Sequence, residues 1–133
     1  MTNILNNLSL SANSANFMIN FIDKVNILYD NSGAGKSFLL NVLNKYISLS
    51  NSSVFDRNYN NLTGEIDYSA DVVILDNADL YLTDEIISCL KTSRCVSVIS
   101  LHRLFDYKLM DKCIGKYMLT RDKEGIIHTK RGI

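Results

Sequence analysis

The chain contains no proline among its 133 residues, and no low-complexity segment divides it. A chain of this length lies within the usual range of one domain, so we expect residues 1–133 to form a single unit whose first part, 1–16, is frayed or loosely held. The 14 basic and 14 acidic residues balance to a formal net charge of zero. The chain therefore has no overall basic field that would indicate nucleic acid as a partner, although a weak excess of Lys and Arg from Lys91 onward leaves that question open.

Cysteine and histidine are also scarce. Cys89, Cys95 and Cys113 are odd in number and widely spaced, without a C-x-x-C pair, and the chain has two histidines. This pattern indicates reduced thiols rather than a disulfide framework or a zinc site. No apolar run approaches the roughly 20 residues of a membrane helix, and the N-terminus lacks the features of a signal peptide. We expect a cytoplasmic protein without a membrane span.

Glycine is used sparingly, yet two of the six glycines stand two positions apart in the most informative segment. The apolar run Val25–Tyr29 predicts a strand, a small-residue loop follows it, and the loop ends in Gly35, Lys36 and Ser37 at the start of an apolar helix. Such a loop turns backbone N–H groups toward one centre, to which the helix adds its positive dipole end. We therefore expect the loop to bind a nucleotide phosphate tail through Asn31, Ser32, Gly33, Ala34, Gly35, Lys36, Ser37 and Phe38.

The side chains of this loop suit Mg²⁺ and phosphate. Lys36 would reach the β and γ phosphates as a catalytic point charge, and the Ser37 hydroxyl would ligate Mg²⁺. The usual pattern is G-x-x-x-x-G-K-[ST], and Asp30 replaces its first glycine. That carboxylate could repel a triphosphate, or it could cap local N–H groups while pointing away. We favour the second interpretation because Gly33 and Gly35 are intact.

A second apolar run, Val72–Leu75, ends at an acid, Asp76. A continuous apolar run is typical of a strand that is covered on both faces in a parallel sheet. The carboxylate would emerge at the carboxyl edge of the sheet, where ligands bind in open α/β folds. We therefore predict that Asp76, together with Ser37, supports the metal.

These two segments resemble the Walker A and Walker B motifs of the P-loop NTPase superfamily. The resemblance covers about residues 17–130 and is greatest to a minimal ATP-binding-cassette or related additional-strand ATPase core. It implies a three-layer α/β/α sandwich with a mainly parallel sheet, an antiparallel edge and a C-terminal hairpin. It also implies ATP and Mg²⁺ as ligands, and the choice of ATP over GTP rests on this likeness alone.

Two positions bear on hydrolysis. The residue after the Walker B acid is normally a Glu that orients water, and here it is Asn77, whose amide can position water but cannot act as a general base. His102 follows the next apolar strand of the sequence, and the resemblance implies that it contacts the γ-phosphate or water. The alternative is a histidine that faces solvent or caps a helix. We expect slow turnover.

The remaining segments predict the secondary structure around the site. Phe17–Ile22 would be an edge strand paired with the phosphate-loop strand, and Val54–Tyr59 a short strand. Thr83 would cap a helix, and a second helix over Leu104–Ile114 would end at Gly115. Segments 116–121 and 126–130 would form the terminal hairpin.

The sequence thus predicts Mg-ATP binding with slow or partner-stimulated hydrolysis to ADP and phosphate. Because the chain has no evident lid or arginine finger, we expect a protein partner or a second copy to complete the site. A regulatory switch that binds nucleotide without hydrolysis is the alternative, favoured by Asp30 and Asn77. A small-molecule kinase is the third reading, which the lack of an arginine-rich lid disfavours.

Overall fold

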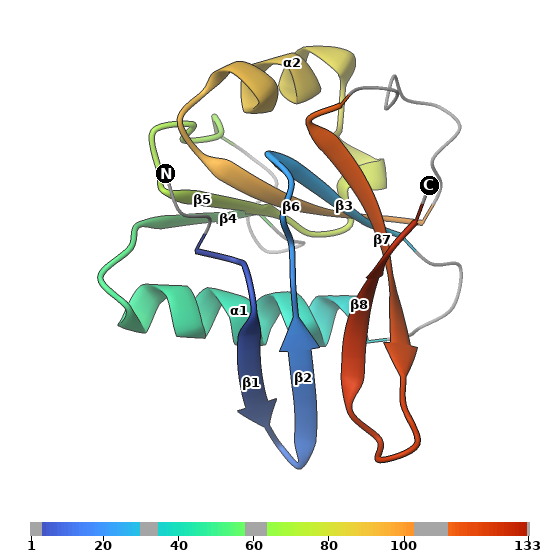
Figure 1. Cartoon of the computed structure of the whole chain (residues 1–133). Helices are drawn as coiled ribbons and strands as arrows, with labels where there is room; N and C mark the ends of the chain where they lie inside the picture. The colour runs from blue at the N-terminus through green and yellow to red at the C-terminus, as the bar shows by residue number, and fades with distance from the viewer. Residues whose placement is uncertain (1–3, 30–34, 58–63, 103–111, 133) are drawn as a thin grey trace.

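The computed structural model describes residues 4–29, 35–57, 64–102 and 112–132. Eight strands form one sheet in the order β1-β2-β8-β7-β3-β6-β5-β4 (Figure 1). The strands are β1 Leu8–Ala12, β2 Ala15–Ile19, β3 Val25–Tyr29, β4 Val54–Arg57, β5 Val72–Leu75, β6 Val96–Leu101, β7 Ile114–Arg121 and β8 Ile127–Arg131. The helices are α1 Lys36–Leu49, the short 3-10 helix η1 Ala78–Leu80 and α2 Asp84–Thr92.

The expected three-layer α/β/α sandwich is wrong. The described chain is mostly β, a curled mixed sheet resembling half a barrel, with only two α-helices in the described ranges. Five neighbouring strands, β7, β3, β6, β5 and β4, are parallel. Beyond them the sheet continues through β8, β2 and β1, where β7–β8 and β1–β2 are antiparallel and β2–β8 is parallel.

The curl of the sheet surrounds α1. This helix contacts β1 at one end of the sheet and β4 and β5 at the other. Its buried apolar side chains, Leu39, Leu40, Leu43 and Ile47, join one face of the sheet in the first core. The opposite face packs against α2 in a second core that includes Ile87 and Leu90. Each sheet face therefore buries its own set of side chains, as period-2 alternation requires.

The N-terminal segment accounts for much of the difference from the expected fold. Residues 1–16 were expected to be frayed or loosely held, and the described part instead contains β1 and the start of β2, which form a hairpin in which Ala12 pairs with Ala15. Asn13 and Ser14, with φ of 48° and 69°, make the two-residue turn. Such left-handed turns match the twist of a hairpin. Leu8, Leu10, Phe17 and Ile19 alternate with polar or exposed residues, so one face of the hairpin completes the α1 core.

Two sequence predictions near β7 are also wrong. The strand predicted at Phe17–Ile22 pairs with β1 and β8 rather than with β3, whose neighbour on that side is β7. Gly115 does not end a helix but lies within β7. A Cβ at Gly115 would lie 1.8 Å from Asp23 Oδ2, so this position needs glycine for close approach. Most of the predicted helix 104–114 lies outside the described residues.

Several local predictions are confirmed. The strands after which the two motifs stand are β3 and β5, and the terminal hairpin is β7–β8. Val54–Arg57 is a strand, with residues 58 and 59 beyond the described part. Thr83 caps α2, since its side-chain oxygen accepts the N–H of Ile86 at 3.1 Å. The described cysteines are free thiols. Within the described ranges no helix has the length and apolarity to cross a membrane.

Candidate functional site

The candidate site lies at the carboxyl ends of β3, β6 and β5. In the parallel register Tyr29 pairs with Leu101, and Leu75 pairs with Ile99. The residues that follow these strands therefore meet at one edge of the sheet, where α1 also begins. The edge collects Ser37, Asp76, Asn77 and His102 from separate parts of the chain.

Asp76 is the centre of a small hydrogen-bond network. Its Oδ1 atom accepts the Ser37 hydroxyl at 3.1 Å and the Ser100 hydroxyl at 2.7 Å. The Ser100 hydroxyl in turn accepts the backbone N–H of Asn77 at 2.7 Å. Asp76 is only 9% exposed and Ser100 only 1%. The Walker A-like and Walker B-like residues are thus in direct contact although 39 positions separate them.

The first turn of α1 carries positive charge. Lys36, the first residue of the helix, is 7% exposed, which is rare for lysine. The N-cap, Gly35, adopts a left-handed conformation with φ of 89° and has no side chain that could cap the helix. The first turn also contains no acid. The start of α1 therefore combines the positive end of the helix dipole with a lysine, a suitable environment for an anion.

The turn after Asp76 contains one left-handed residue and is held by a tyrosine side chain. Asn77 has φ of 51°, a left-handed conformation that Asn tolerates better than most residues. The Tyr81 hydroxyl donates to the Asp76 carbonyl oxygen at 2.8 Å. Burial, with the nearby Asp76 charge, raises the pKa of Tyr81, so its hydroxyl stays protonated and remains a donor.

His102 faces a second carboxylate. Its backbone N–H donates to Asp79 Oδ1 at 2.7 Å, and its ring Nδ1 lies 3.4 Å from the same oxygen. The His102 side chain is 51% exposed and the Asp79 side chain 26%. The pair leaves the other ring nitrogen, Nε2, on a solvent-accessible imidazole at the site edge, close to where β3 ends.

The structure brings together most of the predicted site residues that it describes. Gly35, Lys36, Ser37, Asp76 and Asn77 meet at the sheet edge, with His102 beside them. Phe38 differs because its ring packs against Phe17, at 5.8 Å between centroids, so a ligand contact from its backbone stays a prediction. The predicted phosphate-binding residues Asn31, Ser32, Gly33 and Ala34, and the variant position Asp30, lie outside the described residues.

Sequence reasoning missed Ser100 and Tyr81. The signal for Ser100 was a hydroxyl near the end of a mainly apolar parallel strand, one position from Leu101 and therefore on the opposite face. The α1 core forms on that face, and Ser100 meets Asp76 there. For Tyr81 the sequence offered only its place in the turn after Asp76.

The donor set fits a magnesium ion that is held mainly by ligand and water. In the described part of the chain, no three or more His, Cys, Asp or Glu side chains gather as a metal cage. The available donors are the Ser37 hydroxyl and the Asp76 carboxylate, both hard oxygens. Mg²⁺ usually keeps several waters and takes one or two protein ligands with substrate phosphates.

Comparison with known proteins does not assign the chain to a family. No protein-family model matches the chain, and no curated protein or solved structure matches it significantly. The function therefore has to be argued from the chemistry of the residues at this edge.

Proposed function

We propose that this protein binds a magnesium-complexed nucleoside triphosphate, ATP, and hydrolyses it slowly or with the help of a partner. The contact between Ser37 and Asp76 at 3.1 Å is the observation that carries the proposal. A serine directly after the buried Lys36, at a glycine-capped helix start, meets a carboxylate at the end of a parallel strand. Lysine, hydroxyl and carboxylate are the side chains that a Mg-triphosphate site requires.

Strand order supports the same proposal. β6 lies between β3, which leads into the proposed phosphate loop, and β5, which ends at Asp76. One further strand between these two is the arrangement expected of an additional-strand ATPase core. Because β6 supplies Ser100 and leads directly into His102, the inserted strand contributes to the site edge.

Each residue has a role in binding. Lys36 would contact the β and γ phosphates, with the amides of the first turn of α1 beside it. Ser37 and Asp76 would hold the metal, Ser37 directly and Asp76 through water. When bound, Mg²⁺ neutralises phosphate charge that develops during transfer.

Hydrolysis would be limited by the absence of a strong base at the position after Asp76. The Asn77 amide can orient water but cannot remove its proton. His102, with Nδ1 facing Asp79, could accept a hydrogen bond from that water through Nε2. Slow turnover follows, and a partner protein or a second copy could supply the missing charge stabilisation.

Calorimetric titration with Mg-ATP tests the binding proposal. Lys36→Ala should weaken binding roughly 10- to 100-fold, the effect of losing one hydrogen bond to a charged group. Asp76→Asn, which keeps the shape of the side chain, should abolish the dependence of affinity on Mg²⁺. Lys123→Ala, at an exposed turn position, is the matched control and should bind as the wild type does.

Thermal shift extends the test to ligand choice. ATP with Mg²⁺ should raise the melting temperature because a ligand that binds only the native state stabilises it. A flat response to ATP, GTP and their diphosphates would end the proposal. A larger shift with GTP than with ATP would keep the site and overturn the assignment of the base.

A switch that binds nucleotide without hydrolysing it is the second candidate, and it is favoured by Asn77, whose amide cannot act as a general base. Asn77→Glu separates the two: a large gain in ATPase rate indicates a hydrolysis scaffold, and no gain at unchanged ATP affinity indicates a switch. The left-handed φ of 51° strains Glu by about 1 kcal/mol, so the melting temperature of the variant has to be compared as well.

A further inference from the structure

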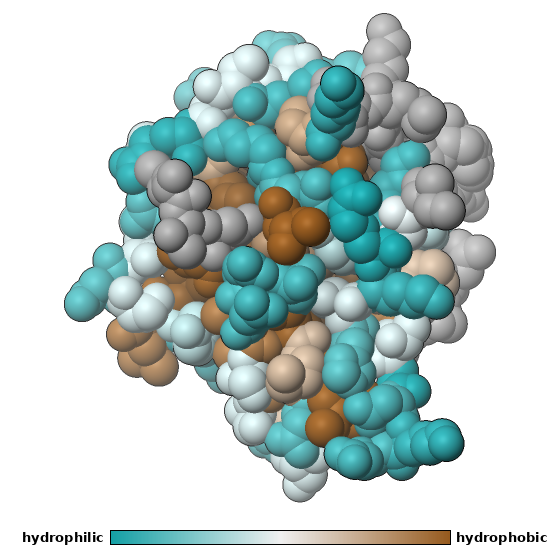
Figure 2. All heavy atoms as spheres, in the orientation of Figure 1, coloured by the Kyte–Doolittle hydropathy of each residue, from teal (hydrophilic) through white to brown (hydrophobic). Residues whose placement is uncertain are grey.

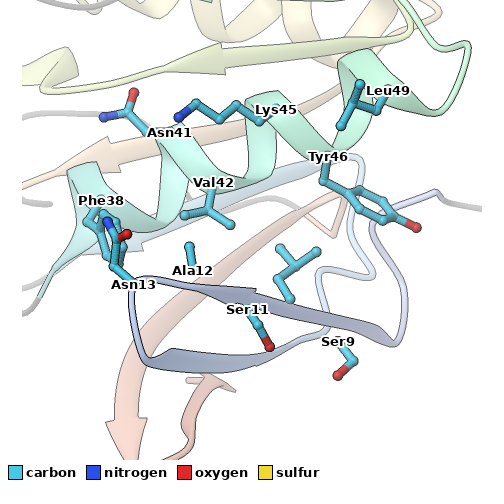
Figure 3. A pocket seen from close by; sticks show the side chains of 11 residues that line it. Ser9, Ser11, Ala12, Asn13, Phe38, Asn41, Val42, Lys45, Tyr46 and Leu49 are labelled. Atoms are coloured by element: carbon cyan, nitrogen blue, oxygen red, sulfur yellow. The ribbon is translucent and has the colours of Figure 1, made fainter.

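A groove of about 740 Å³ runs between β1 and α1 (Figure 3). It is lined by Ser9, Leu10, Ser11, Ala12 and Asn13 from the β1 side and by Phe38, Asn41, Val42, Lys45, Tyr46 and Leu49 from α1. Of these lining residues, Phe38 alone also belongs to the predicted phosphate loop, and only through its backbone.

The β1 side of the groove is the edge of the sheet. Its lining residues are five consecutive positions, Ser9–Asn13. Neighbouring side chains of a strand point to opposite faces, so a pocket on one face would be lined by alternate residues. Consecutive residues line it because the main chain itself borders the groove. β1 stands at the end of the strand order and, within the described chain, pairs with β2 alone.

The α1 side is a stripe on one helix face, most of it exposed, although Val42 packs against the first core and Phe38 against Phe17. Residues 38, 41, 42, 45, 46 and 49 follow the i, i+3, i+4, i+7 spacing of one helix face. Phe38 is 36% exposed, Tyr46 41% and Leu49 87%. Figure 2 shows hydrophobic surface at the left of the view, where Figure 1 places the C-terminal end of α1.

We propose that this groove is a docking site for an extended, acidic peptide segment of a partner protein, which adds to β1 as a further strand. An unpaired edge offers main-chain N–H and C=O groups to a strand, and alternate side chains of the strand would lie on the α1 stripe. Natural edges are usually protected by charge, proline or a bulge. The sequence of β1, Leu-Ser-Leu-Ser-Ala, contains no charge or proline.

Charge selects the occupant. Among the described residues, Lys45 is the one charged residue in the lining of the groove, and none of the described lining residues is acidic. A segment with Asp or Glu opposite Lys45 is therefore complementary. A second copy seated by the same patch would bring another Lys45 and no acid, which disfavours a symmetric dimer here.

The test begins with selection from a random library of peptides about ten residues long, the upper length of common strands. The library is panned on the wild-type protein and counter-selected on Val42→Asp, which places a charge in the centre of the stripe. We expect enriched sequences to alternate apolar and polar residues and to carry an acid. Enrichment without an acid, or no enrichment over Val42→Asp, would overturn the proposal.

Fluorescence anisotropy of the enriched peptide then tests both elements of recognition. Lys45→Glu should weaken binding about tenfold or more, and replacing the peptide's acid by Lys should restore it on that variant. Lys123→Glu is the matched charge control on a distant exposed turn and should leave binding unchanged. Equal loss with Lys123→Glu would show a non-specific charge effect and refute the site.

N-methylation of the peptide separates strand addition from other modes. Methyl groups on one alternate set of amides should abolish binding, because those N–H groups would pair with β1, whereas methyl groups on the other set should be tolerated. Equal tolerance of both sets refutes strand addition. Sedimentation velocity supplies the last arm, since a dimer of the free protein that Val42→Asp dissociates would make a second copy the occupant and overturn the proposal.

Discussion

Replacing Ser100 by Ala gives the sharpest test of the Asp76 network. Ser100 is 1% exposed, and its hydroxyl both donates to Asp76 and accepts from the Asn77 N–H, each at 2.7 Å. A hydrogen bond to a charged group contributes about 1.5–3 kcal/mol, and a buried N–H that loses its partner costs about 1–3 kcal/mol. Because the two effects overlap in one small site, we expect Ser100→Ala to lower the free energy of unfolding by about 3 kcal/mol.

Urea denaturation monitored by circular dichroism measures this change. With an m-value of about 1.5 kcal/mol per molar urea, the midpoint should fall by about 2 M without a change in slope. A domain of typical stability remains folded after this loss. The purified variant can therefore also be titrated with Mg-ATP, and we expect weaker Mg²⁺ dependence because Asp76 is no longer oriented.

The same strand provides the control. Ser97 is 0% exposed, and its hydroxyl has no hydrogen-bond partner among the described residues. Ser97→Ala removes a buried, unpaired polar atom and should therefore be neutral or slightly stabilising, within about 0.5 kcal/mol. If Ser100→Ala cost no more than Ser97→Ala, the network would have no energetic role and the reasoning about the site would be refuted.

Three further predictions concern the scaffold. Burial alone would raise the pKa of Asp23, but hydrogen bonds from Arg131 and Tyr117 outweigh this effect and lower that pKa. The stability that the ionised Asp23 contributes to the folded state should therefore be complete above about pH 4 and be lost as the pH falls through the folded-state pKa. Denaturation from pH 5 to 2 should accordingly show a steeper loss in the wild type than in Asp23→Asn, and parallel curves would contradict this. Gly115→Ala should lower the free energy of unfolding by about 1–3 kcal/mol because the new Cβ meets the Asp23 carboxylate. The loss should be smaller in an Asp23→Ala background, and strict additivity in this double-mutant cycle would show that the clash is absent. Thr83→Ala should cost about 1 kcal/mol in chemical denaturation by removing the α2 cap, whereas Thr83→Ser should retain most of it; equal losses would mean that the hydroxyl does not act as a cap.

The sequence was sufficient to predict the part of the fold that positions the candidate site. Val25–Tyr29 and Val72–Leu75 were recognisable as buried parallel strands because both are almost wholly apolar. The carboxyl ends of parallel strands share one edge, so the meeting of Ser37 with Asp76 followed from strand direction alone. Local signals such as the Thr83 cap were also sufficient, because a cap depends on a few neighbouring residues.

The global architecture could not be predicted in the same way. The join between β2 and β8 brings Phe17 beside Ile127 from opposite ends of the chain, and no local pattern encodes that pairing. The polar composition of the first residues suggested fraying, yet alternation in Leu8–Ala12 was enough to give one apolar face to the α1 core. Gly115 is ambiguous for a similar reason, since glycine serves a helix end and a close strand contact equally well.

The direction of the hydrogen bonds explains how the site could be ready for a cation before one binds. The Asn77 N–H donates to Ser100, and Ser100 and Ser37 both donate to Asp76 Oδ1. A hydroxyl has one proton and two lone pairs, so a Ser37 that gives its proton to Asp76 keeps its lone pairs for another partner. The network therefore places a hydroxyl oxygen and a carboxylate next to the start of α1, which is the combination of groups that the proposed Mg-triphosphate ligand would need.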